Sequence, residues 1–124
     1  MITGVGIDLV QVKRMERWLF NSKLLERYFH PEEIKLAADR GKNGAQSLAA
    51  RFAAKEAFGK ALGTGLAGIT LKDIAVLNRY GGKPELKLSG TAREAFVKSG
   101  SGRAHISLAH EKETAIAVIV LERD

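Results

Sequence analysis

Apolar and polar residues alternate at the start of the chain. Val5, Ile7 and Leu9 fall on one face of an extended segment, while the other face carries two glycines and Asp8. This period of two predicts a β-strand with one apolar face. The glycines leave space beside the strand on the face that Asp8 shares.

Helical spacing and helix-ending signals dominate the next part of the chain. We expect helices over residues 11–20 and 22–29, and a third helix that begins at residues 30–33 (His-Pro-Glu-Glu). A proline in the first turn with acids beside it favours such a start. Residues 45–62 form the strongest predicted helix, because they are rich in Ala, Leu, Lys and Glu and are followed by Gly63.

Short alternating segments return in the second half. We predict a hairpin of residues 74–77 and 85–88, a short helix at 91–98, and two strands at 104–109 and 114–121. Strands joined by short connections pair antiparallel. The order of elements therefore predicts an α+β fold in which an antiparallel sheet is packed with helices.

Length and composition narrow the class of protein. The 124 residues correspond to a single domain over residues 1–124, with 45% apolar and 27% charged residues. The absence of cysteine excludes a disulfide framework, a thiol nucleophile and Cys-based metal sites. No apolar run approaches the roughly 20 residues that span a bilayer. The N-terminus carries an acid and no basic region, unlike a secretory signal, so we expect a cytoplasmic protein.

The charge balance indicates anionic partners. Twenty Lys and Arg against fourteen Asp and Glu give a net charge of +6. This favours nucleic acid, a phosphorylated small molecule or an acidic protein, although a solvated basic surface explains the balance equally well. A basic binding module without chemistry is one alternative, but aromatic residues are only 6% of the chain and no nucleic-acid recognition motif is present.

Two acids stand in apolar surroundings. Asp8 lies in a segment of Ile, Val, Leu and Gly, and a helical wheel places Glu56 beside Phe52. A carboxylate in such a setting costs free energy unless it is paired or binds a cation. The simpler alternatives are that Asp8 is a solvated residue at the strand end or a helix cap, and that Glu56 is the partner of Lys60. Together the two acids suggest a site for a hard cation such as Mg²⁺.

The same helix supplies three cations, Arg51, Lys55 and Lys60. Cations beside a metal suit a polyphosphate ligand, and a solvated helix face is the alternative. Residues 63–68 match G-x-G-x-x-G, but they follow a helix rather than a strand, so we interpret them as a helix end and turn. A glycine loop that faces phosphate remains an option.

His105 and Ser107 fall on one face of a predicted strand. Side chains two apart on a strand stand side by side, and no third member is evident, which argues against a hydrolase triad. A structural histidine and a phosphate-binding histidine remain open.

Four motifs together resemble the small, single-unit members of the 4′-phosphopantetheinyl transferase family. They are Gly6–Val10 (GIDLV), Arg51–Gly65 (RFAAKEAFGKALGTG), Gly82–Pro84 (GKP) and His105–Ser107 (HIS). The resemblance covers essentially the whole chain, in the family's order, and the Phe52–Gly65 block is the most specific part.

The resemblance implies an enzyme with a defined reaction. Coenzyme A donates its phosphopantetheine arm to a serine of an apo acyl carrier protein in fatty acid biosynthesis, which releases 3′,5′-ADP. Asp8 and Glu56 match the family's metal-binding and catalytic acids, with Mg²⁺ as the metal. The serine needs a base. Glu56, Asp8 and a water on the metal all remain open, and Glu56 is favoured because burial promotes the protonated form of a carboxyl group.

Further positions follow from the resemblance alone. The positions that match the coenzyme A site are Arg51, Lys55, Lys60, Gly63, Gly65, Pro84, His105 and Ser107. Those expected to dock the acidic carrier protein are Lys13, Arg14, Arg17 and Trp18, with Met15 nearby. The family's small members are homotrimers with active sites at subunit interfaces, and no nucleic acid or membrane partner is expected. Ala109 departs from the family pattern, which often has a hydroxyl residue there.

Overall fold

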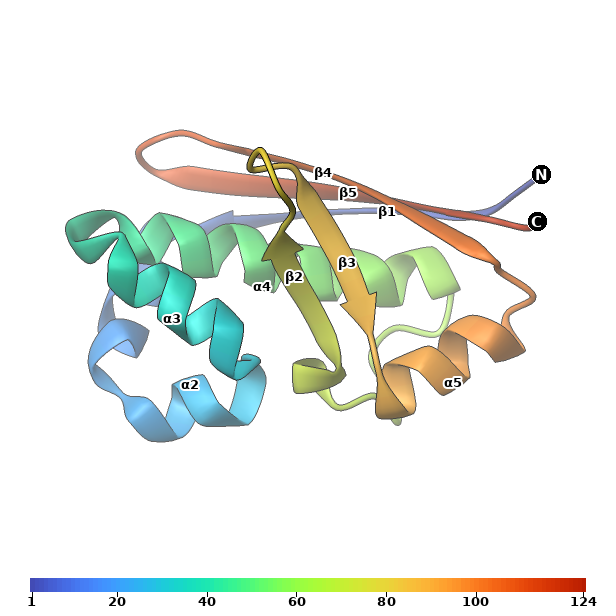
Figure 1. Cartoon of the computed structure of the whole chain (residues 1–124), viewed down its shortest axis with the longest axis horizontal. Coiled ribbons are helices and arrows are strands. Elements are labelled where there is room, and N and C mark those ends of the chain that lie inside the picture. Colours follow the sequence, from blue (N-terminus) through green and yellow to red (C-terminus); the bar gives the residue numbers. More distant parts are fainter.

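The computed structural model describes all 124 residues. It has the predicted α+β fold, with five strands and five α-helices (Figure 1). The strands are β1 (Ile2–Gln11), β2 (Ile74–Asn78), β3 (Pro84–Leu88), β4 (Arg103–His110) and β5 (Thr114–Glu122). The α-helices are α1 (Val12–Glu16), α2 (Ser22–Tyr28), α3 (Pro31–Asp39), α4 (Gly44–Leu62) and α5 (Gly90–Lys98). Short 3₁₀ segments are η1 (Arg17–Phe20), η2 (Gly41–Asn43) and η3 (Leu71–Asp73).

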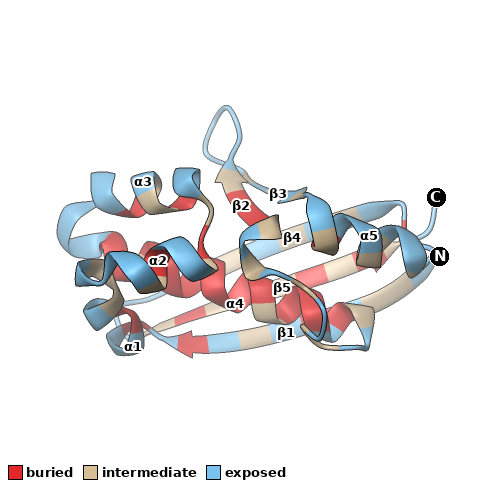
Figure 2. Cartoon of the chain, turned by 90° about the horizontal axis from the view of Figure 1, so that it is seen from below, coloured by how far each residue is buried: buried red, intermediate tan, exposed pale blue.

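The strands form two antiparallel sheets. β1, β5 and β4 lie side by side in that order, and β2 pairs with β3 as a separate hairpin. Helix α4 runs along one face of the larger sheet, and α1, α3 and strand β2 pack against other parts of it (Figure 1). Figure 2 shows α4 as the most buried element.

The predicted helix over residues 11–20 is divided in the structure. Helix α1 ends at Glu16, and the chain tightens into η1, where Trp18 packs between the rings of Tyr28 and Phe52 at centroid distances of 5.4 and 5.6 Å. Burial of the indole against these rings fixes the tighter turn. Asn21 then caps α2 by accepting a hydrogen bond from the backbone N–H of Leu24.

The glycine face of β1 packs directly on α4. A Cβ added at Gly4 would lie 1.8 Å from the carbonyl oxygen of Ala61, and one at Gly6 would lie 1.9 Å from that of Ala57. Only glycine permits so close an approach of two backbones. The space that the glycines leave beside the strand is therefore filled by α4, and β1 runs antiparallel to the helix axis.

The apolar face of β1 consequently points away from the core. Val5, Ile7 and Leu9 are 59%, 53% and 59% exposed. Their register partners on β5, Val118 and Ile116 among them, continue the same uncovered face. We call this surface the outer sheet face: Val5, Ile7, Leu9, Ile116, Val118 and Val120.

None of the helices is both long enough and apolar enough to cross a membrane.

Candidate active site

Asp8 is held on the inner face of β1 by a lysine from α4. The Nζ of Lys60 donates hydrogen bonds to Oδ1 of Asp8 at 2.9 Å and to the carbonyl oxygen of Ile7 at 3.1 Å. The Asp8 side chain is 19% exposed. Asp8 does not cap α1, whose N-cap is Gln11, and Lys60 pairs with Asp8 rather than with Glu56.

Glu56 lies one turn before Lys60 on α4 and is half-buried. Its carboxylate makes no hydrogen bond or ion pair within the chain. Because Gly6 meets Ala57 and side chains on a helix lean towards its N-terminus, Lys60 reaches back over the turn that carries Glu56. The packing therefore brings Asp8 beside that turn, and the two acids predicted to act together share one region.

The donors in this region suit a magnesium ion that takes most of its ligands from water and substrate. They do not suit a cation that is ligated by protein side chains alone. Asp8 is partly shielded, Glu56 has no partner, and the chain contains no group of three or more metal-ligating side chains. Mg²⁺ commonly binds through one or two carboxylates and completes its shell with water and substrate phosphate oxygens. Asp8 and Glu56 could supply that pair.

Lys55 and Arg51 lie on a different side of α4 from Lys60. Nζ of Lys55 is fully buried; it donates to Oε1 of Glu33 at 2.7 Å and to the carbonyl oxygens of Leu71 and Ile74. Burial lowers the pKa of Lys55, while the charge of Glu33 and the hydrogen bond to it act in the opposite direction. The structure thus separates the three cations that the sequence grouped together.

Arg51 is likewise buried and fully engaged with protein atoms. Its Nε donates to the carbonyl oxygen of Val76 at 3.0 Å, and its Nη atoms donate to Oγ of Ser47 and Oδ1 of Asn78. Burial lowers the pKa of Arg51. Both side chains tie α4 to its neighbours in the single chain, and their predicted contact with coenzyme A stays a prediction.

Sequence reasoning missed Glu33, which is wholly buried. Its Oε1 accepts from the backbone N–H of His30 in a capping box and from Lys55, and its Oε2 accepts from the backbone N–H of Val76. The capping-box spacing from His30 to Glu33 was a visible signal. That the same carboxylate neutralises a lysine 22 positions away was not visible.

Pro84 and His105, predicted separately, line one hollow of about 300 Å³. The other lining residues are Arg79, Lys83, Glu85, Leu86, Ala104 and Ile106. Arg79 pairs with Glu85 at 3.1 Å, whereas Lys83 has no carboxylate partner. Sequence reasoning missed Arg79 and Lys83 as part of this site, although both stand in the predicted turn before Pro84.

His105 is oriented by an acid from the neighbouring strand. Its Nε2 lies 2.9 Å from Oε1 of Glu122 on β5. The hydrogen bond from His105 is the main cause that lowers the pKa of Glu122. Ser107 follows on the same exposed face of β4, as the strand period predicts.

The glycine loop after α4 is a helix end and turn. Gly63 and Gly65 have φ values of 82° and 68°, in the left-handed region that favours glycine. The N–H of Gly65 donates to the carbonyl oxygen of Gly59, which folds the loop back on α4. Both residues predicted to contact coenzyme A are thus placed at the C-terminal end of the helix that carries Lys60.

The predicted docking residues form an exposed basic surface. Lys13, Arg14 and Arg17 are exposed and take part in no ion pair, and the guanidinium of Arg14 lies 5.1 Å from the ring centre of Phe52. Trp18 is half-buried in the aromatic cluster. Met15 is fully buried and belongs to the core rather than to this surface.

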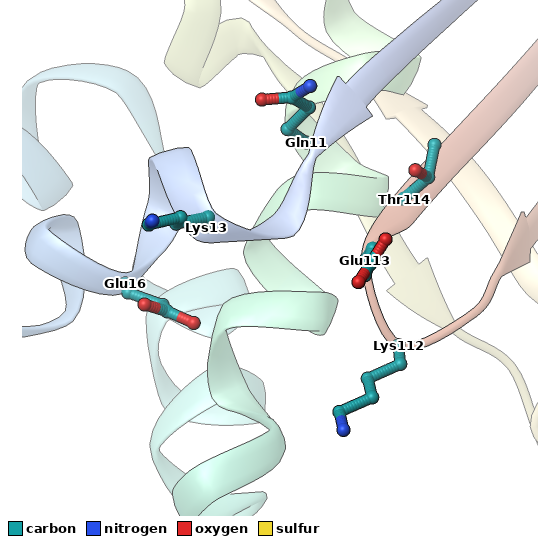
Figure 3. Close-up of a pocket in the computed structure, with 6 residues that line it drawn as sticks. All are labelled: Gln11, Lys13, Glu16, Lys112, Glu113 and Thr114. Carbon is teal, nitrogen blue, oxygen red and sulfur yellow. The ribbon is translucent and has the colours of Figure 1, made fainter.

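A groove of about 430 Å³ borders this surface, between α1 and the turn that joins β4 to β5 (Figure 3). In Figure 3 Lys13 and Glu16 form one side and Lys112 and Glu113 the other. Two lysines and two glutamates balance each other, and no apolar residue lines the groove. The groove contains none of the residues predicted to bind the coenzyme.

Comparison with known proteins shows which family the chain resembles. The model of the 4′-phosphopantetheinyl transferase superfamily matches residues 4–119. The chain is 57% identical over 122 residues to a holo-[acyl-carrier-protein] synthase of Treponema denticola, which covers 98% of this chain and 99% of that protein.

Solved structures give the same result. A holo-(acyl-carrier-protein) synthase from Bacillus anthracis in complex with CoA (3′,5′-ADP) superposes with a TM-score of 0.82 at 37% identity, over 100% of this chain and 99% of that one. The Helicobacter pylori synthase in complex with coenzyme A gives a TM-score of 0.81 at 33% identity, over 95% and 99%.

Proposed function

This chain belongs to the 4′-phosphopantetheinyl transferase superfamily. We propose that it carries out a magnesium-dependent transfer reaction at Asp8 and Glu56. The chain is an enzyme of the holo-[acyl-carrier-protein] synthase type and transfers phosphopantetheine. The proposed donor is coenzyme A, the acceptor is a serine of the apo acyl carrier protein of fatty acid biosynthesis, and the second product is 3′,5′-ADP. The cytoplasmic location stays a prediction.

The observation that carries this proposal is the packing of β1 on α4. It places Asp8, held by Lys60, beside the turn with the unpaired Glu56. Two acids and a lysine at the edge of an apolar helix face suit a pyrophosphate that is bound together with a cation. The basic hollow at His105 and Lys83 offers a second region for anionic groups.

The chain's own residues have distinct tasks in the proposed transfer. Mg²⁺, held by Asp8 and Glu56, would supply neutralisation of the negative charge on the pyrophosphate. Lys60 orients the Asp8 carboxylate through its hydrogen bond and adds positive charge near the phosphates. The serine oxygen bonds to the phosphorus that carries the pantetheine arm, the bond from that phosphorus to the oxygen of 3′,5′-ADP breaks, and the serine proton passes to a carboxylate.

Glu56 is the base that the geometry favours. Asp8 already accepts a charged hydrogen bond from Lys60, so one of its oxygens is engaged. Glu56 has no hydrogen-bond partner within the chain, so one of its oxygens stays available for the serine hydroxyl. A carboxylate within hydrogen-bond reach of the attacking hydroxyl is what general base catalysis needs.

A homotrimer with active sites at its interfaces is part of the proposal. The outer sheet face is apolar and uncovered in the single chain, and apolar side chains such as Ile7 are more than half exposed there. Contiguous exposed apolar surface of this kind is typical of protein interfaces. His105 and Ser107 on β4 share that side of the sheet, so an assembly through this face would bring predicted coenzyme residues to a subunit boundary.

The test is a mass measurement on the acceptor. The protein is incubated with coenzyme A, Mg²⁺ and an apo acyl carrier protein, and the carrier is weighed by intact mass spectrometry. We expect a gain of one phosphopantetheine that EDTA abolishes. Glu56→Gln should abolish the gain while its circular dichroism and melting temperature stay near wild type, and Glu94→Gln on the exposed face of α5 is the matched control. Near-wild-type turnover of Glu56→Gln at saturating Mg²⁺ would refute both roles of Glu56.

A further inference from the structure

One aromatic side chain stands outside the core in the segment between α1 and α2. Phe20, the last residue of η1, is 91% exposed. The two residues before it, Trp18 and Leu19, pack against the core. A single exposed apolar residue is ordinary. The residues around Phe20 indicate that its exposure serves binding.

The geometry of the 3₁₀ turn aligns Phe20 with cations. Residues three apart eclipse each other in a 3₁₀-helix, so Arg17 and Phe20 share one outward face. Arg14 precedes Arg17 by another three residues and is also exposed. No carboxylate of the chain pairs with either arginine. The surface thus presents two uncompensated cations in a row that ends in a phenyl ring.

The backbone under this row is fixed before any partner arrives. Trp18 is locked among the rings of Tyr28, Phe29 and Phe52, and the N–H of Asn21 donates to the carbonyl oxygen of Trp18. An anchor on a rigid backbone loses little conformational entropy when it is buried by a partner. The row therefore combines charge attraction with a preorganised apolar contact.

From these contacts we propose that Phe20 is an apolar anchor for the acidic acyl carrier protein, buried against apolar side chains of the carrier while Arg14 and Arg17 pair with its carboxylates. This inference rests on the proposed function, which names the acidic carrier as acceptor. Charge complementarity selects this occupant over a second copy of the chain, which would repeat the same cations. The segment also lies on the side of α4 away from the larger sheet, so assembly through the outer sheet face leaves it free (Figure 1).

The test separates docking from chemistry. Phe20→Ala should raise the KM for the apo carrier by about 10- to 100-fold, the factor expected when the burial of a phenyl ring is lost. The KM for coenzyme A and the kcat at saturating carrier should stay at wild-type values. Phe20→Leu should recover most of the loss, because it restores an apolar side chain. Val97→Ala, which truncates an exposed apolar residue on α5, is the matched control.

Salt distinguishes the two parts of the surface. The effect of Arg17→Ala should shrink when the salt concentration is raised from about 0.1 to about 0.5 M, because exposed charges are then screened. The effect of Phe20→Ala should persist, because apolar burial is not screened. A loss in Phe20→Ala that disappears with salt would overturn the anchor role.

A binding measurement keeps the inference independent of turnover. Trp18 is the only tryptophan, so its fluorescence reports the docking of a tryptophan-free apo carrier close to Phe20. The dissociation constant should rise in Phe20→Ala by the same factor as the KM. A Phe20→Ala protein within twofold of Val97→Ala in both measurements overturns the inference. A wild-type protein that binds the carrier but transfers nothing would instead refute the proposed function and leave the comparison at Phe20 valid.

Discussion

Gly6 provides the sharpest test of how the fold positions Asp8. The two residues share the inner face of β1, and Gly6 lies against the backbone of α4. In Gly6→Ala the new Cβ would lie 1.9 Å from the carbonyl oxygen of Ala57, whereas ordinary van der Waals contact begins at 3.4 Å. β1 must therefore move away from α4 by about 1.5 Å, the difference between these distances. Because backbone atoms form the contact, no side chain can rotate to relieve it.

The displacement of β1 in Gly6→Ala should lower both the stability and the activity of the protein. Overpacking of this kind lowers the free energy of unfolding by about 1–3 kcal/mol, which urea titration measures. Displacement of a catalytic group by about 1 Å costs on the order of 100-fold in rate, so kcat/KM for carrier modification should fall by about that factor. Assays at a temperature well below the melting transition keep the two effects separate.

Gly41→Ala is the control for loss of a glycine as such. Gly41 has a φ of 54° and no heavy atom within 4 Å of an added Cβ, so it tests backbone strain without a clash. Strain of about 1–2 kcal/mol is expected there with kcat/KM unchanged. If Gly6→Ala kept wild-type activity, or if Gly41→Ala lost as much activity, the packing of β1 on α4 would not be what positions Asp8.

Three further changes test other parts of the structure. Lys55→Met should lower the free energy of unfolding by about 3–5 kcal/mol in urea titration, because it leaves the buried Glu33 carboxylate without its cation; a loss below about 1 kcal/mol would contradict the ion pair. Ile7→Glu places a charge on the outer sheet face, so light scattering after gel filtration should show a folded monomer in place of a trimer. A trimer that persists in Ile7→Glu would show that this face is not the interface. The lowered pKa of Glu122 stabilises the fold above the carboxyl group's unfolded pKa of about 4.3, and that contribution is lost as pH falls through the lower folded value. The stability advantage of wild type over Glu122→Gln should therefore fade in acid, while an advantage that is constant from neutral pH to pH 2–3 would argue against the bond to His105.

Several features of the site were readable from local sequence. The helix over residues 45–62 begins one residue earlier in the structure and ends where Gly63 predicts. Asp8 and Glu56 stood out because each interrupts an apolar pattern, and the structure brings their elements into contact. The alternation of His105 and Ser107 also correctly placed both on one face of β4.

Pairings between distant residues were not readable in this way. Lys60 was expected to pair with Glu56 if it paired at all, since the two are one helical turn apart. It pairs with Asp8 instead, because β1 lies against that turn. Arg79 and Lys83 join His105 only because the β2–β3 hairpin folds back towards β4.

The sequence by itself determined the order and type of the elements, the family motif and the two acids, because each depends on residues close together in the chain. The tertiary structure decided which way those elements face. An apolar strand face is normally turned inward, yet in β1 the glycine face is inward, since only glycine lets the strand approach the α4 backbone. The same packing sends Lys55 into the core with Glu33 and Lys60 to Asp8. Spacing along a helix fixes the angle between two side chains, but the neighbour that each side chain meets is set by contacts across the whole fold.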